Sequence, residues 1–268
     1  MKLGVMPGDT LPATELKTEG FDAMQLFWGA GDDAPAKDPE PEKIAATLAA
    51  GNLDLAAMTL HIDLVGPRGR IDADVERTID LVGRTAALDI HKGDNPRSIL
   101  VWHPSGYPKG EGLDDRAIFD GLCSALTDIC RVAESSGIDI AIEITRNGSV
   151  GSAETFLHLI DRVGSSALKA CIDAANFCPD RTPLVRAVRS LAPYTVIAHG
   201  KDCSFKDNGE PDTYGPTGSG RLDYDTYIQS LLEFAPEVPY FVLEYYKSRD
   251  DLLRARDIVQ AAMAKGSH

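Results

Sequence analysis

The chain has 268 residues, and its 27 Lys and Arg residues against 41 Asp and Glu residues give a formal net charge of -14. This acidic balance argues against a nucleic-acid partner, because binding to a phosphate backbone depends on clustered Lys and Arg side chains. No apolar run approaches the about 18 residues of a membrane span, and the first residues are too short an apolar stretch for a signal peptide, so we expect no membrane association.

Eight short apolar runs are spread along the chain, and helical patterns separate most of them. The predicted strands are residues 2–6, 23–28, 55–61, 99–103, 139–144, 168–174, 195–199 and 240–245. The predicted helices are residues 41–50, 73–88, 115–135, 153–163, 183–191, 224–234 and 250–264, and residues 11–19 form a weaker helical pattern. Thr182 with Pro183, and Ser248 with Asp251, are typical of helix starts.

Alternating strands and helices predict an α/β protein with a parallel sheet. The length is near the ~250 residues of a (β/α)8 TIM barrel, so we predict one barrel domain over residues 1–265. Residues 266–268 look like the remnant of an expression tag.

Three long loops follow predicted strands, at residues 29–40, 104–114 and 203–223. Barrel enzymes build their sites from the loops that follow the strands. The third loop contains Gly218-Ser219-Gly220, and we interpret it as a lid or substrate-binding loop, with a solvated excursion as the alternative. Its glycines are weak evidence for a phosphate site.

The chain has five cysteines, and no two of them form a CxxC pair. Neither a zinc knuckle nor a disulfide framework is therefore indicated, and a reducing cytoplasm is the expected location. A homo-oligomer is compatible with the sequence, which does not specify a subunit number.

Four consecutive predicted strands each end in a side chain that binds metals well. They supply Glu143, Asp173, His199 and Glu244. A buried carboxylate without a partner costs several kcal/mol, so Glu143 in particular needs one. Strand ends of a barrel converge at its mouth, which predicts that the four side chains meet there.

Two Glu, one Asp and one His make a mostly hard-oxygen ligand set. Such a set suits Mn²⁺ or Mg²⁺, with Co²⁺ or Zn²⁺ as alternatives. Taken alone, each of these carboxylates is more often part of a salt bridge, and the histidine is more often a core or rim residue with its hydrogen bonds satisfied, than a metal ligand. Four of them at successive strand ends favour a metal site.

Several motifs resemble the xylose isomerase-like TIM barrels, a superfamily that includes sugar epimerases, hydroxypyruvate isomerase, inosose and dehydroshikimate dehydratases, and endonuclease IV. The matching segments are Gly20-Phe21-Asp22, His61, residues 101–106, residues 143–147, residues 172–176, His199-Gly200-Lys201-Asp202, Gly218-Ser219-Gly220 and Glu244. The resemblance implies that Glu143, Asp173, His199 and Glu244 are metal ligands and that Glu143 and Glu244 also transfer protons.

The nuclease branch of this superfamily is the poorer match. His61 and His103 correspond to extra zinc ligands there, but residues 208–215 lack the expected Asp-x-His pair and Asn176 stands where the nuclease has a histidine. A three-zinc DNA repair site is therefore not expected. His61 and His103 are instead candidates for binding substrate hydroxyls, or simply rim histidines.

Further candidates for substrate binding follow the strands. Asn176 and Lys201 could contact a polar substrate and a developing oxyanion, and Arg146 could clamp a carboxylate or hydroxyl. Trp28 could stack on a sugar face or fill the core, whereas Trp102 lies inside an apolar strand and is expected in the core.

We therefore predict a metal-dependent isomerase or epimerase of a small sugar, keto-sugar or polyol. A metal that chelates adjacent carbonyl and hydroxyl oxygens acidifies the carbon-bound proton, and the two glutamates could move that proton through an enediolate. The alternatives are a lyase that dehydrates a keto-polyol and a non-catalytic sugar-binding barrel.

Overall fold

The structure is a computed structural model that describes residues 1–8, 10–30, 34–88, 90, 93, 95–104, 106–179 and 182–266. Part of the predicted loop 29–40, Ser105 within the motif at residues 101–106, and the last two residues of the expected tag remnant lie outside the described residues.

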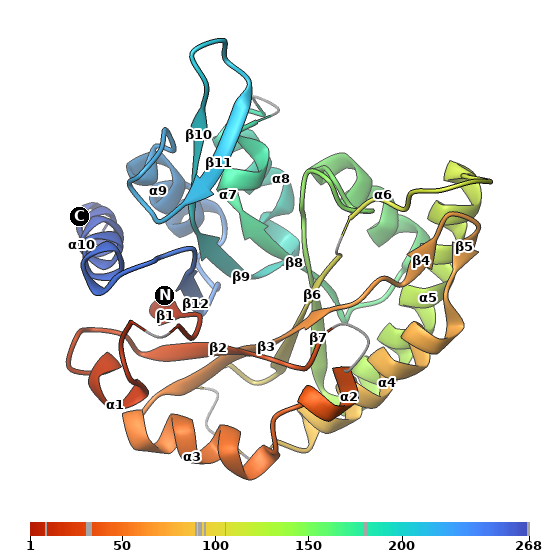
Figure 1. Cartoon of the computed structure of the whole chain (residues 1–268), viewed down its shortest axis with the longest axis horizontal. Helices are drawn as coiled ribbons and strands as arrows, with labels where there is room; N and C mark the ends of the chain where they lie inside the picture. The colour runs from red at the N-terminus through yellow and green to blue at the C-terminus, as the bar shows by residue number, and fades with distance from the viewer. Residues whose placement is uncertain are drawn as a thin grey trace.

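Eight parallel strands close into a barrel in the order β1-β12-β9-β8-β7-β6-β3-β2 (Figure 1). Their bounds are Lys2–Val5 (β1), Ala23–Phe27 (β2), Asp54–His61 (β3), Ser98–His103 (β6), Ile138–Glu143 (β7), Leu168–Asp173 (β8), Thr195–Gly200 (β9) and Tyr240–Leu243 (β12). All eight coincide with predicted strands to within about two residues at each end. The predicted (β/α)8 architecture is confirmed.

Helices surround the barrel (Figure 1). The longer ones are Pro41–Gly51 (α3), Asp72–Ala86 (α4), Asp115–Ser136 (α5), Ala153–Val163 (α6), Leu184–Leu191 (α8), Tyr224–Phe234 (α9) and Arg249–Lys265 (α10). Short turns of helix are Ala13–Leu16 (α1), Ala34–Lys37 (α2), Ala174–Phe177 (α7) and the 3-10 turn Ala192–Tyr194 (η1). The weak pattern at residues 11–19 thus gives one short helix. No helix of the described chain is long and apolar enough to cross a membrane.

Two antiparallel hairpins lie outside the barrel. Val65–Gly66 (β4) pairs with Gly69–Arg70 (β5), and Asp202–Phe205 (β10) pairs with Pro211–Gly215 (β11). Figure 1 shows β10 and β11 projecting beyond the barrel on the side of α7 and α9. The third long loop of the sequence therefore carries a hairpin that directly follows β9.

Residues along the strands alternate between two hydrophobic clusters. Ile99 and Val101 belong to the cluster inside the barrel, whereas Leu100 and Trp102 belong to the cluster packed against the helices. Trp102 is buried, as predicted, and its indole N–H donates to Ile62 O at 2.8 Å. The interior cluster also contains Ala141, Cys171, Ile197 and Val242. Each precedes a predicted metal ligand by two positions, so the alternation directs all four ligands inward.

Two helix starts test the predicted caps. Ser248 caps α10 as expected, because its hydroxyl accepts a hydrogen bond from the Asp251 amide at 3.1 Å. The prediction for α8 is wrong by one residue: Pro183 is the N-cap and no side chain caps the helix. Pro183 has a ψ of 118°, which places it outside the helical region. All five cysteines are free.

Candidate functional site

The four predicted metal ligands come together at the mouth of the barrel. One ligand atom each from Glu143, Asp173, His199 and Glu244 lies within 4.8 Å of the other three. Their strands β7, β8, β9 and β12 are neighbours in the barrel, which explains how residues 101 positions apart in sequence meet. Glu143, Asp173 and His199 are almost fully buried. The geometric part of the prediction therefore agrees with the structure.

His199 is oriented by a neighbour on the opposite side of the barrel. Its Nε2 lies 3.0 Å from Gln25 Oε1, and Gln25 Nε2 donates to Thr59 Oγ1 at 2.8 Å. A carbonyl oxygen only accepts, so Nε2 carries the proton of this hydrogen bond. His199 Nδ1 then faces the carboxylates, 3.4 Å from Glu143 Oε2 and 3.9 Å from Glu244 Oε1.

This arrangement of His199 passes a test for metal binding. Nδ1 is buried and has no hydrogen-bond partner within the described part of the chain. A buried ring nitrogen that is held by its other nitrogen and aimed at carboxylates is the usual arrangement of a histidine ligand. The residues present therefore fit a divalent cation.

Lys201 brings a positive charge into the same group. Its Nζ contacts Asp173 Oδ2 and lies 3.0 Å from Glu244 Oε1 and 3.5 Å from Glu143 Oε1. Gly200, which directly precedes Lys201, has no side chain, and a Cβ at this position would be 2.5 Å from the Phe241 ring of β12. The predicted residue Lys201 thus lies within the ligand group.

The buried carboxylates of the group differ in the direction of their pKa shifts. Burial alone would raise the pKa of Glu143, but Lys201 and His199 hold it well below its usual value. Burial raises the pKa of Asp173 to about 7, although the adjacent Lys201 opposes this. Burial alone would lower the pKa of His199, but the adjacent Glu143 carboxylate raises it well above its usual value. Glu143 is therefore ionised and able to accept a proton at neutral pH.

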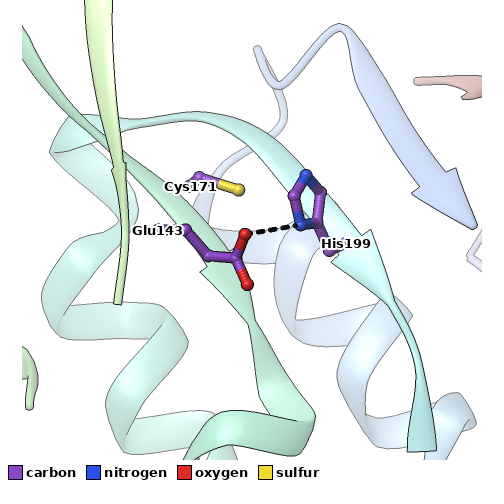
Figure 2. A group of neighbouring side chains, drawn as sticks. All are labelled: Glu143, Cys171 and His199. Carbon is purple, nitrogen blue, oxygen red and sulfur yellow. Dashed lines mark ion pairs between the residues drawn. The ribbon is translucent and has the colours of Figure 1, made fainter. Parts of the chain in front are cut away.

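Cys171 lies beside the group, one interior position before Asp173 on β8. Figure 2 shows its sulfur next to Glu143 and His199, which are joined by their ion pair. Glu143, Cys171 and His199 form a second set with ligand atoms within 4.8 Å of one another. Burial raises the thiol pKa to about 11, so Cys171 is a neutral neighbour at pH 7.

Three further predicted residues lie at or beside the site. Asn176 Nδ2 donates to Glu143 Oε1 at 3.4 Å, and His103 Nε2 lies 3.8 Å from the same oxygen. His61 stacks on His103 with ring centroids 4.6 Å apart. Burial and the nearby His103 lower the pKa of His61, which favours a neutral ring.

The structure corrects the prediction for Trp28. Its ring is buried against α4, where Nε1 donates to Thr85 Oγ1 at 3.1 Å and the Arg84 guanidinium lies 4.6 Å from the ring centroid. Along β2 the inward positions are Ala23 and Gln25, so Trp28 faces the helices. We therefore remove Trp28 from the candidate site. Arg146 is exposed in the turn after β7, outside the buried group.

Two tyrosines of α9 hold the strand ends that carry the site. Tyr227 Oη donates to Ile172 O at 3.0 Å and lies 3.1 Å from His199 O, and Tyr224 Oη donates to Lys201 O at 2.7 Å. Tyr245 directly follows Glu244 and has a φ of 62°. A bulky residue rarely adopts this left-handed conformation, and such strain is concentrated at functional sites.

The glycine loop after the hairpin is occupied by a carboxylate of the chain. Asp202 accepts hydrogen bonds from the amides of Gly218 at 3.1 Å, Leu222 at 3.0 Å and Cys203 at 2.8 Å. Gly218 has a φ of 83°, which glycine adopts without strain. These amides already donate to the Asp202 carboxylate, so they are not free to bind a phosphate group, which disfavours the phosphate-binding interpretation.

Sequence reasoning missed Gln25, Thr59 and Cys171, and also the two tyrosine rings that approach Lys201. Gln25 had a usable signal, because it is an amide within the apolar strand pattern 23–28. Nothing in the local sequence singles out the Tyr214 and Tyr245 rings, whose centroids lie 5.0 and 5.2 Å from Lys201 Nζ.

Solved structures with the same fold are found at low sequence identity. D-psicose 3-epimerase from Clostridium cellulolyticum H10 is 15% identical with a TM-score of 0.70, covering 99% of this chain and 98% of that one. The probable 3-DHS dehydratase from Bacillus anthracis is 17% identical with a TM-score of 0.70, covering 100% and 99%. A Mycobacterium smegmatis barrel solved in complex with magnesium is 17% identical with a TM-score of 0.67, covering 95% and 88%.

Comparison with curated protein sequences finds no match. The family model described as "Xylose isomerase-like TIM barrel" matches residues 13–264, nearly the whole chain. This match agrees with the closed eight-stranded barrel and with the sequence motifs at its strand ends. The chain belongs to the xylose isomerase-like TIM barrel family.

Proposed function

We propose that the chain is a divalent-metal-dependent isomerase or epimerase of a small sugar, keto-sugar or polyol. The observation that carries this proposal is the convergence of three carboxylates and one directed histidine nitrogen within 4.8 Å. The likeness in fold to sugar epimerases and to a magnesium-bound barrel supports the choice of substrate and cation.

Glu143, Asp173, His199 and Glu244 would hold the cation, with Mn²⁺ or Mg²⁺ suited to their oxygen-rich set. When bound, the cation would polarise adjacent substrate oxygens and make the neighbouring carbon-bound proton more acidic. Glu143 is the candidate for the base that removes this proton, because its carboxylate is ionised at neutral pH and lies beside His199 and Lys201 in the ligand group. Glu244, from the other end of the four-strand group, would donate a proton to the enediolate, and exchange with solvent would restore the starting protonation of both carboxyl groups.

Other residues of the site would bind the substrate. Lys201 carries a charge that can stabilise a developing enediolate oxygen, and Asn176 contacts Glu143 directly. His61 and His103 line the adjacent strand ends and can exchange hydrogen bonds with hydroxyl groups. Burial of Glu143 at 2% exposure supports proton transfer over plain binding, because it shields the carboxylate from bulk water.

One observation favours a lyase as the second candidate. His103 lies 3.8 Å from Glu143 and stacks on His61, and its ring could donate a proton to a departing hydroxyl. Dehydration would change the product mass by the loss of water, whereas isomerisation would conserve it. Mass spectrometry of products therefore separates the two reactions.

The test is proton exchange in heavy water with a panel of ketoses, inososes and dehydroshikimate in the presence of Mn²⁺. We expect deuterium to enter one carbon-bound position of a turned-over substrate and the Glu143→Gln variant to abolish this incorporation. Processing at the full wild-type rate by both Glu143→Gln and Glu244→Gln would reject the proton-transfer scheme and favour a binding barrel.

A further inference from the structure

Lys201 occupies an unusual position for a residue that contacts substrate. Its side chain is 4% exposed, and its ammonium group contacts carboxylate oxygens of three of the four candidate metal ligands. The structure thus places a cation of the chain itself at the point where the carboxylates converge.

A metal ion would require the same oxygens. Mg²⁺ or Mn²⁺ bonds carboxylate oxygens at about 2.1 Å, well inside the 3.0 Å between Lys201 Nζ and Glu244 Oε1. An ammonium group that stayed in contact with these oxygens would lie next to a doubly charged ion in a buried environment, where like charges repel strongly. The two cations therefore compete for one position.

A second position for the ammonium group lies close by. The rings of Tyr214, on hairpin strand β11, and Tyr245, after β12, lie 5.0 and 5.2 Å from Lys201 Nζ. The two rings meet edge to face with centroids 5.9 Å apart. Tyrosine faces attract ammonium groups within about 6 Å of the ring centroid, so Lys201 already has contacts with both rings, and a small shift of its flexible side chain would release the carboxylates while keeping the rings.

We propose that Lys201 is an internal competitor for the metal position and that a divalent cation binds by displacing its ammonium group toward Tyr214 and Tyr245. The inference rests on the proposed metal site and adds a residue that sets the metal affinity. In the metal-free protein Lys201 would neutralise part of the charge of the three carboxylates. In the metal-bound protein its ammonium group would face Tyr214 of the hairpin and Tyr245.

The test is Mn²⁺ affinity of the metal-stripped protein, measured at fixed pH and ionic strength from the loss of the free Mn²⁺ electron paramagnetic resonance signal. We expect Lys201→Met to bind Mn²⁺ at least tenfold more tightly than wild type, and Lys201→Arg to show no tightening because it keeps the charge. Lys206→Met is the matched control, since Lys206 is an exposed hairpin lysine paired with Glu210.

The direction of displacement is tested with Tyr214. Tyr214→Leu should weaken Mn²⁺ binding by about two- to fivefold in the wild-type background, because the displaced ammonium depends on this aromatic face more than the carboxylate-bound ammonium does. The same substitution should have no effect in the Lys201→Met background. Tyr214→Phe keeps the face and should leave the affinity unchanged.

The outcomes separate this inference from the proposed function. Equal or weaker Mn²⁺ binding by folded Lys201→Met, while wild type binds, would overturn the competition and leave the metal site intact. Absence of Mn²⁺ binding by every variant would overturn both. Equal weakening by Tyr214→Leu in the two backgrounds would overturn the direction of displacement. Thermal unfolding of each variant verifies that it is folded.

Discussion

The two ends of the barrel treat buried carboxylates differently. At the amino ends of the strands each acid has its own cation: Asp54 pairs with Lys2 at 2.8 Å, and Asp139 pairs with Arg97 at 2.5 Å. At the carboxyl ends Glu143, Asp173 and Glu244 share Lys201. One-to-one pairing stabilises the closed barrel, whereas an excess of negative charge at the mouth is suited to a further cation.

The largest expected effect is on turnover, which should depend on a carboxylate at the carboxyl ends of the strands and not on one at the amino ends. Glu143→Gln should lower turnover by about 10²- to 10⁴-fold, the contribution typical of a general base. Asp139→Asn, a carboxylate removed from the amino end, should leave turnover of the folded enzyme within about twofold. Steady-state kinetics on the substrate found in the exchange screen provides the measurement. Similar losses in the two variants would remove the functional distinction between the ends.

Metal addition should stabilise the protein only through the ligands at the carboxyl ends of the strands. At a Mn²⁺ concentration of 100 times Kd, the free energy of unfolding should rise by about 2.7 kcal/mol. Asp173→Asn should lose most of this stabilisation, because an amide replaces one of the negatively charged ligands. Arg97→Leu, which changes the opposite end of the barrel, should keep it. Thermal unfolding with and without metal, reversed by a chelator, measures the effect. A full gain in Asp173→Asn would exclude Asp173 as a ligand.

Removal of a cation at the amino end should cost stability. Arg97→Leu leaves Asp139, with a side chain 6% exposed, buried without its partner. Loss of a fully buried partner costs about 3–5 kcal/mol, and the one-third exposure of Arg97 reduces our expectation to about 2 kcal/mol. Urea unfolding gives the value. A change below about 0.5 kcal/mol would show that the pair is screened like a surface ion pair.

The smallest effect concerns a carboxylate with an excess of cations. Asp38 accepts from Arg77 at 2.6 Å and also pairs with Arg84. Burial alone would raise the pKa of Asp38, but Arg77, the Gly29 amide and Arg84 lower it below 3.8. A lowered folded pKa gives stability that is present above the unfolded value and is lost as the pH falls through the folded pKa.

Wild type should therefore exceed Asp38→Asn in free energy of unfolding by about 1 kcal/mol at pH 6, and the difference should shrink below pH 4. Urea unfolding at pH 6, 4 and 3 tests the sign. A difference that grows on acidification would contradict the assigned direction of the pKa shift.

The barrel was predictable because its eight strands are continuous apolar runs and its main helices have clear apolar periodicity. The same logic predicted the convergence of Glu143, Asp173, His199 and Glu244, since parallel strands end at one side of a barrel. The hairpin β10–β11 was missed because Pro211–Gly215 is polar and partly exposed and lacks the alternation of a core strand.

Side-chain direction was less predictable than strand position. Trp28 was a candidate for stacking on a sugar or for filling the core, and the unbroken alternation along β2 from Ala23 turns it toward the helices. Contacts such as that of Gln25 with His199 join residues 174 positions apart, and only the closed barrel brings them together. Local periodicity contains no information about such pairs.

The most direct test of the shared-cation site is a crystal structure of the protein with Mn²⁺, using anomalous scattering to locate the ion. We predict one peak bonded to Glu143, Asp173, His199 Nδ1 and Glu244, with the Lys201 ammonium withdrawn from the carboxylates. Full Mn²⁺ occupancy at another place, with Lys201 still between the three carboxylates, would contradict the account.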